Sequence, residues 1–308
     1  MPYRRSYRRP RTTRKRTTRR GYGGRTARRR YPTTRRRYPR KMSNKRILNL
    51  TSRKKRDTML GISQGGASGT PTAGPYPVPA VTELPGNVSI FLWCPTARDN
   101  LFNNGNDGTV FDQSTRTATT CYMRGLKETI EFQTNSGVPW QWRRICFTTK
   151  DPTQLGITAA YNPWIETSRG FGRFMRNLSY TGPIDTAVVE ALREVVFKGR
   201  IQVDWNDYMT APIDTNRVSL FSDKTTIISS GNANGVLRRY NKWYPMNKNL
   251  VYNDDENGDN TAASYYSTTG KAGMGDYYVL DFIMAGRGST SSDVMSFAPT
   301  ATLYWHEK

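Results

Sequence analysis

Short runs in which apolar and polar side chains alternate dominate the chain beyond residue 60, and they predict β-strands. In residues 122–133, Leu126, Ile130 and Phe132 fall on one face, and Lys, Thr and Glu side chains fall on the other. This period of two is typical of a half-buried strand. The run 88–93 is apolar almost throughout, which predicts a strand buried on both faces. Residues 42–60 are expected to join the basic segment to the first strand of the body, and further strands are expected at 140–147, 201–205, 217–228, 277–284 and 301–306.

The segments between these strands differ greatly in length. We expect an ordered surface loop at 61–85, a turn-rich excursion at 100–108, a long loop at 155–182 and a projecting loop at 232–275. The short turn at Ser136–Gly137 predicts that the strands on either side of it pair with each other.

One helix is predicted, at 185–194, where Val189, Leu192 and Val196 share a face and Asp185 is placed to cap the first turn. About eight strands joined by such unequal loops predict an all-β fold, a single eight-stranded jelly-roll sandwich with two four-stranded sheets and long loops. No repeat of fixed period is found, which argues against propellers and solenoids.

The first 56 residues have a different character. They contain 25 of the 47 lysines and arginines and no acidic residue, so residues 57–308 hold 22 basic and 24 acidic residues, a net charge of −2. Like charges at this density repel, and almost no side chain before Ile47 can be buried. We therefore divide the chain into a disordered arm at 1–56 and a folded domain at 57–308.

A polyanion is the expected partner of the arm, because the planar guanidinium of arginine matches phosphate oxygens. Tyrosines between the basic runs offer faces on which unpaired bases stack. The candidate phosphate-binding residues are Arg4, Arg5, Arg8, Arg9, Arg11, Arg14, Lys15, Arg16, Arg19, Arg20, Arg28, Arg29, Arg30, Arg35, Arg36, Arg37, Arg53, Lys54, Lys55 and Arg56. The candidate stacking residues are Tyr3, Tyr7, Tyr22, Tyr31 and Tyr38. Binding of this kind tolerates many sequences and depends strongly on salt.

A basic arm can also serve other purposes. Recognition by a nuclear-import receptor is expected as a second use of the same residues. An amphipathic membrane-surface helix is disfavoured because the arm lacks an apolar face, and 25 charges without periodic apolar residues are too many for a mitochondrial transit peptide. A secretory signal would need an apolar core, and a membrane span would need an apolar run of about 18 residues. We find neither, so no membrane partner is expected.

The sequence offers little catalytic chemistry. His306 is the only histidine, near the C-terminus, and a partly exposed histidine at a strand end explains it better than a Ser-His-Asp site. No phosphate-binding loop motif occurs, and carboxylate pairs for acid–base catalysis cannot be recognised from spacing. We therefore expect no enzyme activity and no cofactor.

Two remaining patterns concern metals and thiols. Asn253, Asp255, Asn257 and Gly258 resemble the start of a calcium loop, but Ser264 occupies the position of the bidentate glutamate. A solvated turn is the preferred interpretation, and weak calcium binding is the alternative. Cysteines 94, 121 and 146 lack zinc-ligand spacing and are odd in number, so they are expected to be buried free thiols in a reducing compartment.

Four segments resemble the capsid proteins of genomoviruses of the gemycircularvirus type. The run 44–60 (NKRILNLTSRKKRDTML) resembles their junction between arm and body, and 121–128 (CYMRGLKE) resembles their central strand. The run 140–149 (WQWRRICFTT) resembles the next strand, and 299–308 (PTATLYWHEK) resembles their C-terminus. The similarity runs from end to end, apart from the 232–275 region.

This resemblance implies a single jelly roll, a T=1 icosahedral shell of 60 copies, and packaging of a circular single-stranded DNA genome replicated in the host nucleus. It also points to fungal or fungus-associated hosts. The expected partners are the single-stranded DNA genome, further copies of the chain and a nuclear-import receptor, and the expected locations are the virion and the host nucleus. Only the resemblance favours DNA over RNA.

Two other function classes remain open. A cellular nucleic-acid-binding protein with a basic tail, of the ribosomal or chromatin type, would usually carry basic residues over its folded domain as well, so a net charge of −2 there counts against it. A β-sandwich hydrolase would need a catalytic cluster that a single terminal histidine cannot supply.

Overall fold

A computed structural model describes residues 42–67, 69–102, 105–180 and 182–308 of the chain. The folded unit comprises residues 44–308, and the following description concerns it. The helices are α1 (Asn44–Thr51), the 3-10 helix η1 (Pro152–Leu155) and α2 (Pro183–Val196). The strands are β1 (Arg53–Met59), β2 (Gly61–Gly65), β3 (Thr72–Ala73), β4 (Tyr76–Pro79), β5 (Val88–Trp93), β6 (Thr120–Thr134), β7 (Trp140–Thr149), β8 (Glu166–Thr167), β9 (Gly170–Phe171), β10 (Arg173–Asn177), β11 (Ser219–Ile228), β12 (Leu237–Val251), β13 (Asp255–Asn257), β14 (Asn260–Ala262), β15 (Asp276–Ala285) and β16 (Val294–Glu307).

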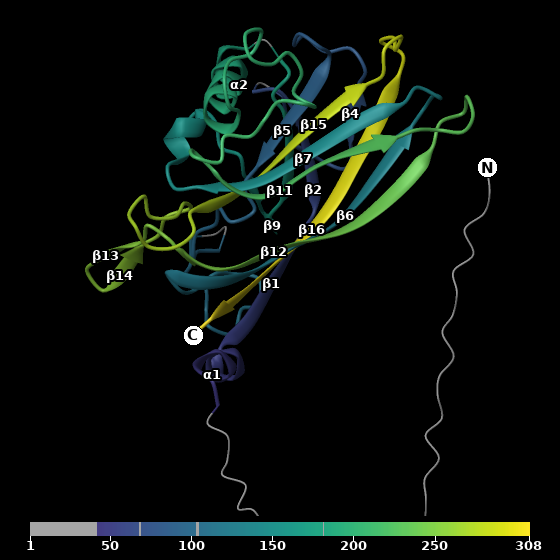
Figure 1. Ribbon diagram of the computed structural model, residues 1–308. Coiled ribbons are helices and arrows are strands. Elements are labelled where there is room, and N and C mark those ends of the chain that lie inside the picture. The colour runs from purple at the N-terminus through teal and green to yellow at the C-terminus, as the bar shows by residue number, and fades with distance from the viewer. Residues whose placement is uncertain (1–41, 68, 103–104, 181) are drawn as a thin grey trace, which may run out of the picture. The chain divides into compact units, whose positions relative to one another are not determined.

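Two large sheets form the body (Figure 1). Sheet A has the order β1-β16-β6-β12, with β4 also paired to β16, and sheet B has the order β11-β7-β15-β5-β10-β2-β3. The long strands from β5 to β16 alternate between the sheets along the chain: β5, β7, β11 and β15 belong to sheet B, and β6, β12 and β16 belong to sheet A. The one exception is the connection from β7 to β11, which stays in sheet B. The predicted all-β sandwich is confirmed, and this strand order is compatible with a jelly roll. The sheets have five and seven strands rather than four each, because β4, β10, β2 and β3 extend them.

The predicted pairing of the two central strands is wrong. β6 lies in sheet A between β16 and β12, whereas β7 lies in sheet B between β15 and β11. The turn at Ser136–Gly137 therefore carries the chain from one sheet to the other. A short connection brings two strands close in space, but it does not require that they exchange hydrogen bonds.

The sheets are buried to different extents. The space between them is filled by two clusters that draw on both, with Leu126 and Trp305 from sheet A meeting Trp93 and Cys146 from sheet B in one of them. A third cluster covers the other face of sheet B, where Val189 and Leu192 of α2 pack above the central strands. The central strands of sheet B are thus covered on both faces, which explains why all six residues of β5 are buried.

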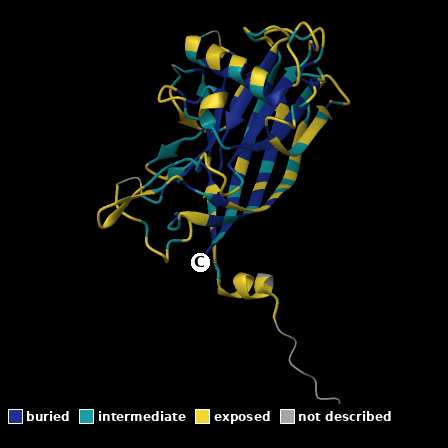
Figure 2. Cartoon of the chain, turned by 60° about the vertical axis from the view of Figure 1, so that its left-hand side comes forward, coloured by how far each residue is buried: buried dark blue, intermediate teal, exposed yellow. Residues whose placement is uncertain are grey.

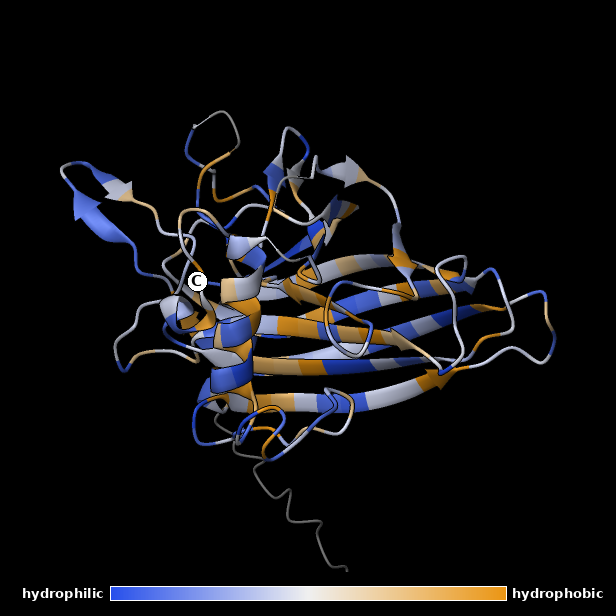
Figure 3. Cartoon of the chain, turned by 90° about the horizontal axis from the view of Figure 1, so that it is seen from above, coloured by the Kyte–Doolittle hydropathy of each residue, from blue (hydrophilic) through white to orange (hydrophobic). Residues whose placement is uncertain are grey.

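Sheet A is covered on one face only. Buried residues alternate with intermediate or exposed ones along most of β6 and β16, as Figure 2 shows. Figure 3 shows the corresponding alternation of hydrophobic and hydrophilic residues along the long strands. The predicted alternation of 122–133 is confirmed, because Leu126, Ile130 and Phe132 are buried. The opposite face of sheet A is open to solvent, and we call it the outer face.

Several predicted loops contain strands. The 61–85 segment holds β2, β3 and β4, and the 155–182 segment holds β10, which pairs with both β2 and β5. The first part of the predicted 232–275 loop is β12, a 15-residue edge strand. Its side chains are exposed or partly exposed at most positions, so the alternation that identifies a half-buried strand is weak there.

Two further local predictions are wrong. Residues 201–205 form turns rather than a strand, because the Asp204 carboxylate accepts a hydrogen bond from the Arg200 backbone N–H at 2.8 Å and leaves Val203 77% exposed. Asp185 does not cap α2, whose N-cap residue is Gly182. The Asp185 carboxylate instead accepts hydrogen bonds from Arg176 at 2.8 Å and from the Ala67 backbone at 2.9 Å.

Within the described ranges, no helix is both long enough and apolar enough to cross a membrane.

Candidate nucleic-acid interface

Most of the predicted arm lies outside the described residues. This holds for the sixteen candidate phosphate-binding residues from Arg4 to Arg37 and for the five candidate stacking tyrosines from Tyr3 to Tyr38. The structure describes the last part of the basic stretch, residues 42–56. These residues form α1 and the first half of β1, so the folded unit begins at Asn44, upstream of the boundary at 56 expected from charge.

Three of the four basic residues at 53–56 are exposed. The Arg53 guanidinium donates a hydrogen bond to the Val110 carbonyl at 3.2 Å and lies 5.6 Å from the centre of the Phe111 ring. The Lys54 ammonium donates to the Ser52 carbonyl at 2.7 Å. Arg56 and Lys54 are both on the outer face of sheet A, because strand residues two apart point the same way. These residues are available to an anionic partner.

Lys55 has a different role from the one predicted. Its side chain is 2% exposed, and its ammonium lies 2.9 Å from a carboxylate oxygen of Glu307, which is equally buried. It also donates hydrogen bonds to the Thr115 carbonyl at 2.9 Å and to the Thr117 hydroxyl at 2.8 Å. Successive strand residues point to opposite faces, so Lys55 points into the sandwich while Lys54 points out. Its ion pair with Glu307 connects β1 to the end of β16, and we therefore assign Lys55 a structural role.

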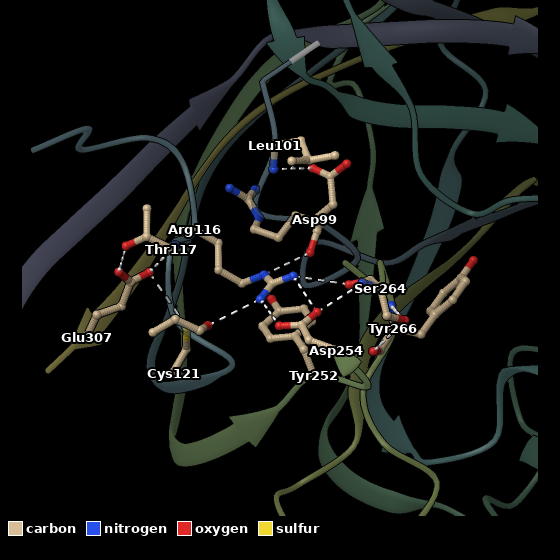
Figure 4. Close-up of polar contacts among 12 residues, drawn as sticks. Asp99, Leu101, Arg116, Thr117, Cys121, Tyr252, Asp254, Ser264, Tyr266 and Glu307 are labelled. Carbon is tan, nitrogen blue, oxygen red and sulfur yellow. Dashed lines mark hydrogen bonds and ion pairs between the residues drawn. The ribbon is translucent and has the colours of Figure 1, made fainter. Parts of the chain in front are cut away.

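The same carboxylate collects further donors (Figure 4). Glu307 accepts hydrogen bonds from the Thr117 hydroxyl at 2.6 Å and from the Trp305 indole N–H at 2.7 Å. Burial by itself would raise the pKa of Glu307. The hydrogen bonds from Thr117, Trp305 and Lys55 together outweigh this effect, so the pKa lies below its ordinary value. The carboxylate is therefore ionised at neutral pH.

Next to this group, Arg116 holds the turn that resembles a calcium loop. Its guanidinium binds the Asp254 carboxylate at 2.6 and 3.0 Å and stacks 3.8 Å from the centre of the Tyr252 ring (Figure 4). Residues 255–257 continue as strand β13, paired with β14. In the part of the chain that the structure describes, no group of three or more His, Cys, Asp or Glu side chains is placed to hold a metal ion.

Several acidic side chains of the body are buried in ion pairs with arginines. Glu128 and Asp281 are each bound by both Arg144 and Arg173, and all four side chains are at most 2% exposed. Asp185 is likewise buried against Arg176. Each of these three acids is matched by one buried arginine, so burial removes equal numbers of both signs and leaves the net charge of the surface unchanged.

Sequence reasoning missed basic residues that the fold gathers on the outer face of sheet A. Arg124 and Lys127 of β6 lie on this face near Lys54 and Arg56 of β1, although about 70 residues separate the two groups in sequence. An alternating pattern indicates which residues share a face of one strand, but it does not give the neighbouring strand. The pairing of β1 and β6 with β16 could not be read from the pattern.

The structure also places the single histidine and the three cysteines. His306 is partly exposed on β16, 6.0 Å from the Tyr122 ring, and partial burial followed by the charges of Lys54 and Arg124 lowers its pKa. The three cysteines are free and buried, as predicted. Burial raises the pKa of each thiol.

No family model matches the chain, and no curated protein sequence matches it.

Proposed function

We propose that the protein is the coat protein of a small virus, which self-assembles into a closed shell and packages single-stranded DNA through its basic arm. The observation that carries this proposal is the segregation of charge. The first 56 residues hold 25 basic residues and no acid, while the rest of the chain has a net charge of −2. A polyanion can cancel the arms of many copies while their nearly neutral bodies come together without strong repulsion.

The body has features that suit self-assembly. It is a two-sheet sandwich, and several large apolar side chains remain exposed on the single chain. Among them are Phe111 at 86%, Leu50 at 72% and Ile227 at 69%. The proposal assigns these exposed side chains to contacts with further copies of the same chain.

The quantity of charge also fits. In a T=1 shell of 60 copies, as the genomovirus resemblance implies, the arms would carry about 1,500 positive charges, which matches on the order of 1,500 phosphates. That is the scale of a genome of a few thousand nucleotides at most. The role is structural and not catalytic, and the same basic runs would serve nuclear import, so the protein would occur in the virion and in the host nucleus.

Microscopy of the purified full-length protein, combined with nuclease protection, tests this proposal. Closed shells of uniform size that protect single-stranded DNA from nuclease are expected. Soluble monomers or dimers that coat nucleic acid without enclosing it would contradict the proposal and favour a cellular nucleic-acid-binding protein. Shells that contain protected RNA would support the coat function but would contradict the choice of DNA.

A further inference from the structure

The outer face of sheet A combines basic and aromatic side chains at the end of the sheet where β1 begins. Four basic residues come from two strands, Lys54 and Arg56 from β1 and Arg124 and Lys127 from β6. Between these strands runs β16, in which Tyr304 lies directly opposite Arg56 on one side and Gly125 on the other. We call Lys54, Arg56, Arg124, Lys127, Trp243 and Tyr304 the basic face.

The aromatic part of this face depends on a glycine. Trp243 of β12 lies opposite Lys127, and its ring is 5.7 Å from the Tyr304 ring at an interplanar angle of 63°. The backbone of Gly125 in β6, which has a φ of 152°, lies next to the Trp243 ring, and a Cβ atom on Gly125 would come within 2.8 Å of that ring. The missing side chain allows the indole to approach the backbone of β6, next to Tyr304. Trp243 is nevertheless 48% exposed.

Acidic side chains are few around the basic face. Among the described strands of sheet A, the outer face carries one acidic residue, Glu131, and its carboxylate is bound to Arg239 at 2.6 Å. The lowered pKa of His306, caused by partial burial and then by Lys54 and Arg124, agrees with a positive potential on this face. A polyanion would meet unopposed basic groups here.

We infer that the basic face is a second contact site for single-stranded DNA, in which phosphates bind the four basic side chains and an unpaired base stacks on the Trp243 ring. This inference rests on the proposed packaging function and adds a contact made by the folded body. Charge complementarity selects a polyanion, and an exposed indole selects a partner with accessible base faces. In duplex DNA, the neighbouring base pairs already cover those faces.

Tryptophan fluorescence of the full-length protein gives a readout specific to this site. The seven tryptophans all lie in the described ranges, and only Trp243 is among the exposed large side chains. The probes are a thymidine oligonucleotide of about 16 nucleotides, an abasic strand with the same number of phosphates, and a duplex of the same length. Labelled versions report total binding by anisotropy.

We expect all three probes to bind, because the arm contacts phosphate, and only the thymidine strand to quench tryptophan emission. The Trp243→Phe variant should lose the quenching and retain most of the affinity, while Trp243→Leu should weaken binding of the thymidine strand about fivefold or more and leave the abasic strand unaffected. Binding without quenching, or equal quenching by the abasic strand or the duplex, would overturn the inference. Failure of every probe to bind would overturn the proposed function as well.

Charge variants test the phosphate contacts. Replacing Arg124 and Lys127 by glutamine should reduce the slope of log K against log salt by about 1.4 for a single strand. The matched control replaces Lys198 and Arg200, which are exposed just beyond α2, the helix that covers sheet B. This control removes the same charge and should leave the slope unchanged. Equal slopes for the two double variants would contradict contacts at the basic face.

Discussion

Glu128 of sheet A accepts a hydrogen bond at 3.0 Å from the guanidinium of Arg173 in sheet B, and neither side chain is exposed to solvent. Arg144 of β7 and Asp281 of β15 complete a buried group of two acids and two arginines that joins the sheets through the core. Both carboxylates receive donors from both arginines. Removal of one member would therefore leave a buried charge without its partner.

The first prediction concerns this group. Glu128→Gln should lower the free energy of unfolding by about 3 to 5 kcal/mol, because an uncompensated guanidinium remains in the core. Urea unfolding followed by circular dichroism measures the change. The matched control is Glu131→Gln on the same strand, which removes an ion pair with Arg239 whose side chains are 34% and 62% exposed. Its effect should be about 0 to 1 kcal/mol, and equal effects of the two variants would contradict a structural role for the buried group.

A second prediction separates two neighbours in the basic run of β1. Lys55→Met should destabilise the fold by about 3 kcal/mol or more, because Glu307 would keep a buried negative charge without its cation. Arg56→Gln removes one charge from the exposed side of the strand and should change stability by about 0.5 kcal/mol or less. Thermal unfolding of the two variants checks this. If Lys55 acted mainly in nucleic-acid binding, Lys55→Met would retain wild-type stability and lose affinity.

Lys55 also illustrates what could be predicted from the sequence. Composition identifies the cluster at 53–56 as basic, and the cluster alone suggests four equivalent phosphate contacts. Its strand conformation makes them unequal, because alternate side chains point to opposite faces and Lys55 meets Glu307 at the far end of the chain. A contact between residues 252 positions apart cannot be read from local pattern.

The difference between local pattern and long-range contact also explains which other elements are predictable from the sequence. The strand at 88–93 is predictable because burial on both faces requires a continuous apolar run. The helix around Val189 and Leu192 is predictable because burial of one face gives apolar residues a helical period. β12 was missed because an exposed edge strand has little such pattern, and 201–205 was misread because alternation also occurs in turns. The basic face needs the order of β1, β16, β6 and β12 in the sheet, which is a property of long-range pairing.

A third prediction concerns pH. Asp276 is fully buried, and burial raises its pKa to about 7, although hydrogen bonds from Ser267 oppose the shift. The unfolded carboxyl has an ordinary pKa of 3.8. Between these values the folded state binds more protons than the unfolded state, so stability should fall as pH rises from about 4 to about 7, by up to about 4 kcal/mol.

Denaturant unfolding over this pH range checks the effect of Asp276. The variant Asp276→Asn should remove this part of the pH dependence, because its side chain does not ionise. Asp293→Asn serves as the control, since hydrogen bonds from Ser136 and Thr290 lower the pKa of Asp293 and its titration falls below the range. A wild-type slope in Asp276→Asn would show that another group causes the dependence.

The last prediction concerns the arm. Deleting residues 1–40 removes 18 of the 25 basic residues and retains α1, β1 and the whole folded unit. The truncated protein should keep the circular dichroism spectrum of the sandwich but should no longer protect single-stranded DNA from nuclease. Any remaining binding should come from the basic face and from residues 41–56, with a much shallower dependence on salt than that of the full-length protein. Truncated protein that still packages nuclease-resistant DNA would contradict the role of the arm, and a flat log–log salt response of the full-length protein would mean that phosphate contacts do not drive binding.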